Sequence, residues 1–110
     1  MSHQLTDALR SCIEECLRCH TICLSELGHC LHAGGAHTEP AHFMLMLDCV
    51  DICRTAANFM SRASPHHPHI CRECAEICRA CAASCEEVGE MEECVLACRR
   101  CAESCEKMAA

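Results

Sequence analysis

Sixteen of the 110 residues are cysteine, and their regular spacing points to chemistry. The stretch CRECAEICRACAASC, residues 71–85, holds five cysteines separated by steps of three, four, three and four residues. Alternating steps of three and four keep side chains on one face of an α-helix. The spacing therefore predicts a helix that turns a stripe of thiols toward a bundle interior, at positions where most helices carry leucine.

The remaining cysteines repeat this pattern on three other segments, and histidine and methionine side chains extend it. His42 and Met46 continue the stripe of the second segment, and Met91 continues the stripe of the fourth. Thiolate, thioether and imidazole groups all bind transition-metal ions. The candidate metal ligands are Cys12, Cys16, Cys19, Cys23, Cys30, Cys49, Cys53, Cys71, Cys74, Cys78, Cys81, Cys85, Cys94, Cys98, Cys101, Cys105, His42, Met46 and Met91.

The helices that must position these residues are delimited by connections rich in helix-breaking residues. Gly, Pro and His gather in two connections, a third contains Gly89, and no β-like alternation occurs in the segments they separate. The chain is therefore predicted to be all-α, a single domain over residues 1–110. The predicted helices span residues 4–32, 40–61, 65–86 and 90–107. Because short connections join antiparallel neighbours, they predict an antiparallel up-down-up-down four-helix bundle with a cysteine-lined core.

Capping residues give the expected helix boundaries. Thr38 and Ser64 are plausible N-caps of the second and third helices, and Pro40 suits a first turn, where a missing N–H has no cost. Gly34 and Gly89 suit the C-terminal positions that need a positive φ.

Charge and composition narrow the function classes. The formal net charge is −7, with nine Lys and Arg residues and no basic cluster, so no nucleic-acid partner is expected. No stretch approaches the roughly 18 apolar residues of a membrane span, and the N-terminal residues lack the pattern of an export signal. We therefore expect a cytoplasmic protein, whose cysteines in that reducing compartment are metal ligands or redox groups rather than disulfides. Nothing resembles a nucleophile–base pair, so no enzyme activity is expected.

Packing, disulfides, iron–sulfur clusters and zinc each account poorly for the thiol stripes. Cysteines that served packing alone would leave the core underfilled, since Cys occupies less volume than Leu. Thiols at i and i+4 of one helix are poorly disposed for disulfide geometry. An iron–sulfur electron carrier would need a C-x2-C-x2-C-x3-C-P run, which is missing. Zinc-thiolate buffering would bury a net charge of about −2 at each four-thiolate site. The iron–sulfur carrier and the zinc buffer stay as alternative functions.

Cu(I) meets the same constraints better. Soft thiolate and thioether ligands select Cu(I). An exchange of one thiol proton for one Cu⁺ leaves the core uncharged, which removes the burial penalty. Helix neighbours at i+3 or i+4 have Cβ atoms about 5–6 Å apart, and two metal–sulfur bonds of ~2.3 Å cover most of that gap. We therefore predict storage or buffering of multiple Cu(I) ions, about one per cysteine.

With its four-helix layout, its inward CxxxC and CxxC stripes and its His- and Met-decorated ends, the whole chain resembles the bacterial copper storage proteins of the cytosolic branch. The resemblance implies a four-helix bundle whose core thiolates hold many Cu(I) ions, and it makes each of the sixteen cysteines a candidate ligand. It also implies a homotetramer. Copper would be exchanged with a donor or acceptor protein or with a small thiol. One departure is that the second helix carries only two cysteines.

The antiparallel topology sorts the histidines and methionines to the two ends of the bundle. One end receives His3, His66, His67, His69 and Met108, and the other receives His29, His32, His37, His42, Met44, Met46 and Met91. Most of these histidines are expected in solvated loops, and His20 is expected to point off the axis. We predict that copper enters at the end with the first and third connections, through His42, Met46 and Met91.

A second apolar stripe lies beside the cysteines on the first two helices. It consists of Ile13, Leu17, Leu24, Leu31, Phe43, Leu45, Val50, Ile52 and Phe59. Part of it must seal the bundle, which should therefore fold without metal. The rest is more apolar than a monomer exposes, so a homo-oligomer that buries these helix faces is expected, with a tetramer favoured.

Overall fold

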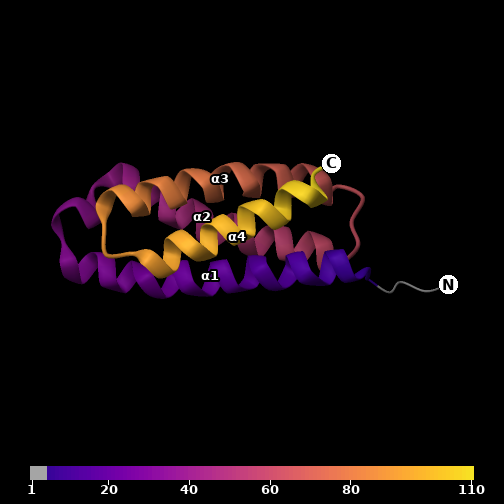
Figure 1. The fold of residues 1–110 in the computed structure, drawn as a ribbon, viewed down its shortest axis with the longest axis horizontal. Helices are drawn as coiled ribbons and strands as arrows, with labels where there is room; N and C mark the ends of the chain where they lie inside the picture. Colours follow the sequence, from indigo (N-terminus) through magenta and orange to yellow (C-terminus); the bar gives the residue numbers. More distant parts are fainter. Residues whose placement is uncertain (1–4) are drawn as a thin grey trace.

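The computed structural model describes residues 5–110, which form a bundle of four long α-helices (Figure 1). The helices are α1 (Asp7–Ala33), α2 (Pro40–Ser61), α3 (His67–Val88) and α4 (Glu92–Met108), and the short 3-10 helix η1 (Gly35–Thr38) lies between α1 and α2. Each helix packs against its chain neighbours, and α4 returns to α1, so the four form a closed square. The all-α up-down-up-down prediction is confirmed.

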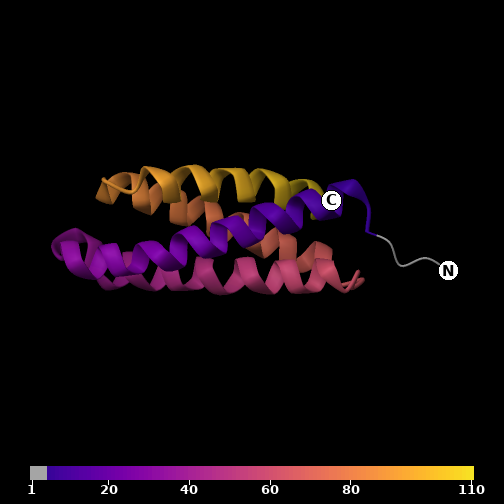
Figure 2. The same cartoon turned by 90° about the horizontal axis from the view of Figure 1, so that it is seen from below.

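The connections define two ends of the bundle. Figures 1 and 2 show η1 and the α3–α4 connection at one end, called the η1 end below. The α2–α3 connection and the C-terminus lie at the opposite end. The prediction that the first and third connections lie at the same end of the bundle is therefore confirmed. His3, predicted at the opposite end, lies outside the described residues.

The core consists of sulfur and small side chains. All sixteen cysteines are buried free thiols, and Met46 and Met60 are the largest fully buried side chains. Alanines fill the spaces between the stripes, at Ala56, Ala57, Ala75, Ala82, Ala97 and Ala102. Ile, Leu, Val and Phe side chains pack around this core while remaining partly exposed. The sulfur-lined interior that the spacing predicted is therefore present, with the larger hydrophobes displaced to the seams.

Three of the four helices differ from the prediction, by one to three residues at each end. The first helix begins at Asp7, after Thr6, whose Oγ1 accepts a hydrogen bond of 3.1 Å from the backbone N–H of Leu9. Helices α3 and α4 begin and end slightly later than expected, at His67–Val88 and Glu92–Met108. The hydrophobic period locates the helices, but short capping contacts decide their last residues.

The predicted N-caps Thr38 and Ser64 are wrong. The N-cap of α2 is Glu39, which makes no side-chain capping bond, and the Thr38 hydroxyl instead donates to the Gly35 carbonyl at 3.1 Å. The N-cap of α3 is His66, whose backbone N–H donates to Ser64 Oγ at 3.1 Å. Both hydroxyl groups therefore stabilise the turns that precede the helices. Both α2 and α3 have a proline in the first turn, which removes one of the N–H groups that a cap would satisfy.

The glycine predictions are confirmed. Gly34 and Gly89 follow α1 and α3 with φ values of 67° and 87°, and their N–H groups donate to the carbonyls of Cys30 and Cys85. Gly35 also has a positive φ, 56°. Two successive left-handed residues are strongly disfavoured for other amino acids. This Gly34–Gly35 turn folds η1 back over the end of the bundle.

A stripe of leucines remains exposed on α1. Leu17, Leu24 and Leu31 recur at seven-residue intervals and are 42%, 49% and 65% exposed. Leu47 on the neighbouring helix α2 is also exposed, whereas Val50 is buried. Among the described residues, no helix has the length and apolarity required to cross a membrane.

Candidate metal centre

The thiols gather into compact clusters along the bundle axis. Three groups each place four Sγ atoms within 4.8 Å of one another, and a fourth group contains three. They are Cys19, Cys23, Cys49 and Cys98; Cys19, Cys53, Cys78 and Cys101; Cys16, Cys74, Cys101 and Cys105; and Cys12, Cys71 and Cys105. The second group takes one thiol from each helix. The inward stripes of four antiparallel helices therefore converge on common sites.

Neighbouring clusters share thiols, so they form one continuous column. Cys19 belongs to the first two clusters, Cys101 to the second and third, and Cys105 to the third and fourth. Individual Sγ–Sγ distances include 3.4 Å between Cys16 and Cys105 and 3.6 Å between Cys53 and Cys78.

These distances suit metal–thiolate bonds. With metal–sulfur bonds of ~2.3 Å, two sulfurs lie about 4.6 Å apart across a linear ion and three lie about 4.0 Å apart around a trigonal one. From the closest separation of 3.4 Å, a pair needs to open by about 0.6 Å for the trigonal ion and about 1.2 Å for the linear one, which side-chain rotation can supply. The interior therefore accepts metal ions without movement of the helices.

A mixed layer of ligands closes the column at the η1 end. Met46 Sδ accepts hydrogen bonds from the thiols of Cys81 and Cys85 at 3.6 and 3.4 Å, and Met91 Sδ accepts one from Cys30 at 3.8 Å. His42 Nε2 lies 3.7 Å from Cys30 Sγ. The three non-cysteine candidates of the sequence are thus buried beside thiols.

The His42 ring is held from its other side. Its Nδ1 is hydrogen-bonded to the Ser84 hydroxyl on α3 at 2.8 Å. That bond fixes the ring plane and leaves Nε2 directed at Cys30. Sequence reasoning missed Ser84, because nothing in the spacing of α3 distinguishes this serine from a solvent-exposed one.

Two other histidines contribute structure away from the column. His20 points off the axis as predicted, and its Nδ1 is hydrogen-bonded at 2.8 Å to the Val50 carbonyl in the seam between α1 and α2. His37 corrects the expectation of solvated loops, because it is only 7% exposed. Its burial follows from the Gly34–Gly35 turn, which carries η1 back against the bundle and gives no periodic signal in the sequence.

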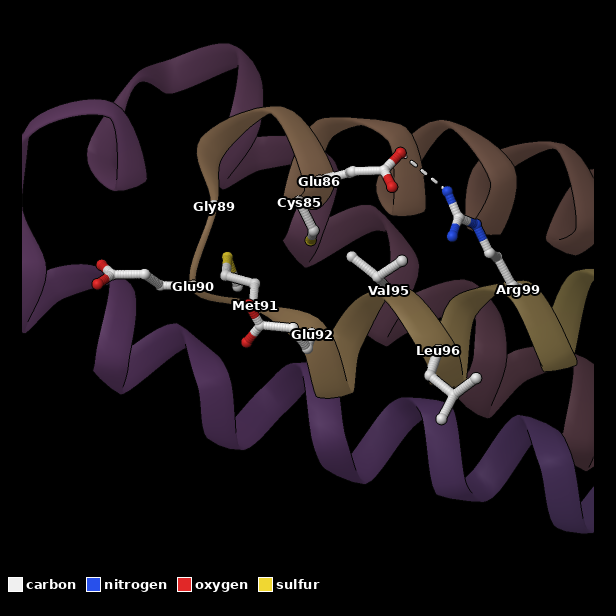
Figure 3. Close-up of a pocket in the computed structure, with 9 residues that line it drawn as sticks. All are labelled: Cys85, Glu86, Gly89, Glu90, Met91, Glu92, Val95, Leu96 and Arg99. Carbon is white, nitrogen blue, oxygen red and sulfur yellow. Dashed lines mark hydrogen bonds and ion pairs between the residues drawn. The ribbon is translucent and has the colours of Figure 1, made fainter.

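A surface pocket of about 400 Å³ reaches the sulfur atoms of this end between α3 and α4. Figure 3 shows Cys85 and Met91 at the pocket, with the acidic side chains of Glu86, Glu90 and Glu92 around it. One of these, Glu86, forms an ion pair of 2.9 Å with Arg99, which also lines the pocket. The surface next to the sulfur ligands is therefore rich in negative charge, which attracts cations.

Hydrogen bonds among the thiols, together with burial, raise the pKa of some cysteines and lower the pKa of others. Bonds from Cys81 and then Cys94 lower the pKa of Cys85 to about 4. Burial, followed by the negative charge of Cys85, raises the pKa of Cys30 above its ordinary value. Bonds to Cys101 and to other thiols likewise raise the pKa of Cys105. At neutral pH the metal-free column therefore contains both thiolates and protonated thiols.

We expect copper loading to release protons, because Cu(I) binds the thiolate and not the thiol. The pKa values of Cys30 and Cys105 are raised above 9.0, so both are protonated at neutral pH and must lose a proton to bind. Cys85, with a pKa of about 4, releases none. Affinity should therefore fall as the pH is lowered. A weakly buffered titration should show acidification of less than one proton per copper, because thiols such as Cys85 are already ionised, and loading without acidification would contradict this prediction.

Comparison with known proteins places this geometry in a family. The family model described as copper storage protein matches residues 5–110. The "Uncharacterized cysteine-rich protein YhjQ" of Bacillus subtilis is 36% identical over 75 residues, which cover 68% of this chain and 69% of the relative.

Solved structures agree in fold. The Nmul_A1745 protein from Nitrosospira multiformis is 52% identical, with a TM-score of 0.92 over 94% of this chain and 97% of that chain. The Cu(I)-bound copper storage protein BsCsp3 is 35% identical, with a TM-score of 0.88 over 94% of this chain and all of that chain. Apo-Csp3 from Bacillus subtilis is 38% identical, with a TM-score of 0.77 over 92% of this chain and 98% of that chain. The chain, with its column of buried thiols, belongs to the copper storage protein family.

Proposed function

We propose that this protein stores Cu(I) as a continuous metal–thiolate cluster along the bundle axis, with about one ion per cysteine. The observation that carries the proposal is the sharing of Cys19, Cys101 and Cys105 between neighbouring four- and three-sulfur groups. A thiolate that bridges two ions lets each ion reach two or three ligands while the total number of thiolates matches the number of ions. The Cu(I)-bound relative BsCsp3, which has the same fold, supports this assignment.

Charge favours copper over zinc in this interior. No Lys or Arg is among the buried side chains of residues 5–110. Zinc in four-thiolate sites would leave each site with a net charge of about −2, with no buried cation to compensate it. One Cu⁺ per thiolate leaves no net charge. Family membership implies storage rather than catalysis.

The proposed ligands are the sixteen cysteines, together with His42, Met46 and Met91 at the η1 end. These three side chains are buried against Cys30, Cys81 and Cys85. Imidazole and thioether bind Cu(I) less strongly than thiolate, so they form a gate from which the ion moves inward to tighter sites. Copper is exchanged there with a donor or acceptor protein or with a small thiol.

Titration with Cu(I) under anaerobic, reducing conditions tests the storage function. In competition with a Cu(I) chelator, the reduced apo protein should take up copper until the ratio approaches the cysteine count of 16. Saturation near one to four ions per chain would contradict storage. A brown, iron-containing protein from anaerobic purification would favour the iron–sulfur alternative instead.

Titration with Zn²⁺ provides the matched control. The first and third of the four-sulfur groups share no thiol. The second group shares Cys19 with the first and Cys101 with the third. Zinc takes four thiolates per ion, and only two of these groups can be filled without a thiolate that bridges two ions, so zinc should saturate at a ratio well below that of copper. Zinc capacity comparable to that of copper would support the zinc-buffering alternative.

We also propose that the protein is a cytoplasmic homo-oligomer, with a tetramer favoured. A reducing compartment supports the cytoplasmic assignment, because it would keep the sixteen buried thiols free to bind metal. The exposed leucine stripe of α1 and Leu47 of the neighbouring helix α2 present apolar side chains of the kind that association covers.

A charge on this stripe should disrupt the oligomer. Leu24→Glu places a carboxylate in the middle of the proposed interface, so light scattering should report a smaller mass than for the wild type. The control is Leu96→Glu, at a leucine of similar exposure on α4. Equal masses for the wild type and Leu24→Glu would contradict the assigned interface.

A further inference from the structure

Three histidine rings form a chain from the surface to the thiol column at the η1 end. His29 on α1 is exposed, whereas His37 on η1 and His42 on α2 are 7% and 4% exposed. The ring centroids of His29 and His37 lie 5.2 Å apart, and those of His37 and His42 lie 6.5 Å apart, each pair edge to face. The innermost ring contacts Cys30 through Nε2. The imidazoles therefore connect solvent to a buried thiol.

The middle ring has unused bonding capacity. Within residues 5–110, the buried Nδ1 of His37 has no hydrogen-bond partner. Its Nε2 lies 4.0 Å from a carboxylate oxygen of Glu90, a side chain that is 83% exposed. An unpaired ring nitrogen in the interior costs free energy, which a bound ligand would recover. The Gly34–Gly35 turn nevertheless holds this ring against the bundle.

The ring separations suit a metal ion between two imidazoles. A metal–nitrogen bond is about 2 Å long and the ring centre lies about 1 Å further, so two rings on one linear ion have centroids about 6 Å apart. The observed values of 5.2 and 6.5 Å fall on either side of this distance. Small rotations of the side chains would bring either pair to it.

We propose that His29 and His37 form an outer Cu(I) docking site and that the ion passes from there through His42 to Cys30. This inference rests on the proposed storage function. The ion stays Cu(I) throughout, and each transfer replaces one ligand by another. At Cys30 the copper–sulfur bond replaces the S–H bond, and the proton leaves to solvent. The Glu90 carboxylate attracts the cation at the surface, and the replacement of imidazole by thiolate at Cys30 makes the inward transfer favourable.

Uptake kinetics test the docking site. Cu(I) supplied as a complex with a bidentate chelator should enter His29→Gln and His37→Gln several-fold more slowly than wild type, with the final capacity unchanged. His32→Gln is the matched control, since His32 is an exposed histidine in the last turn of the same helix, and it should load at the wild-type rate. His29 is exposed, so its replacement tests the site without disturbing the packing of η1.

A second readout reports binding directly. The protein is labelled with 15N-histidine and its thiol column is first filled with one Cu(I) per cysteine. In its NMR spectrum, one further equivalent of Cu(I) should then shift the ring signals of His29 and His37 but not those of His32. Wild-type uptake rates in both docking variants, or unshifted His29 and His37 signals, would overturn the proposal. Failure of the storage function would look different, because the wild-type capacity itself would fall far below the cysteine count.

Discussion

Far-UV circular dichroism of the reduced, metal-free protein is expected to show a strongly helical spectrum. Small metal-dependent domains are unfolded as apo proteins because metal binding supplies their folding energy. This chain has another source of stability, since Ile, Leu, Val and Phe side chains from all four helices pack around the thiol column. The helix ends are also satisfied locally, by Thr6 at the start of α1 and by Gly34 and Gly89 at the ends of α1 and α3.

Copper should therefore stabilise a fold that already exists. Each bound ion that requires the native state adds about 2.7 kcal/mol when free copper is about 100 times its Kd, so the Tm should rise steeply with loading. The helical signal itself should change little. A coil spectrum that becomes helical only on addition of copper would contradict this expectation and would make the cluster part of the folding nucleus.

Replacement of the gate, as Met46→Leu, Met91→Leu and His42→Ala together, is expected to slow copper exchange while leaving capacity almost intact. Met91 lines the pocket at the η1 end beside Cys85, and His42 and Met46 lie against the thiols of Cys30 and Cys85. Without them an ion must pass from solvent to buried thiolate with no intermediate ligand. We expect uptake and chelator-driven removal to slow about tenfold, equivalent to a barrier about 1.4 kcal/mol higher.

The matched control for this variant lies at the other end of the bundle. Met60 is as fully buried as Met46, and Met60→Leu changes the same chemical group there. Stopped-flow measurements should give wild-type rates for Met60→Leu. If Met60→Leu slows exchange and the triple variant does not, copper enters through the opposite end.

The bundle and its sulfur interior could be predicted because the cysteine period is itself the helix period. Steps of three and four residues fix both the secondary structure and the inward face, so Cys19 and Cys101 were assigned to the core without coordinates. The same reasoning placed His42 on the inward stripe, and the structure buries it there. Which thiols share a cluster was not predictable, because this depends on the relative heights of four antiparallel helices.

Local contacts at the helix ends were also beyond the sequence argument. The hydroxyls of Thr38 and Ser64 had the right chemistry for N-caps, but each bonds within the preceding turn instead. Burial of His37 follows from the conformation of the Gly34–Gly35 turn, which depends on how η1 packs against the bundle. A histidine in a glycine-rich connection gives no periodic signal from which its burial could be inferred.

The thiols common to adjacent groups, Cys19, Cys101 and Cys105, also affect how the store empties. An ion next to a shared sulfur can form its new bond before the old one breaks, so it moves along the axis without ever being released. A half-filled molecule is then a set of rapidly interconverting isomers rather than a fixed pattern of full and vacant positions. Ions deep in the bundle reach the η1 end by successive hops, and the rate of release depends on the acceptor waiting there, not on the depth at which an ion began.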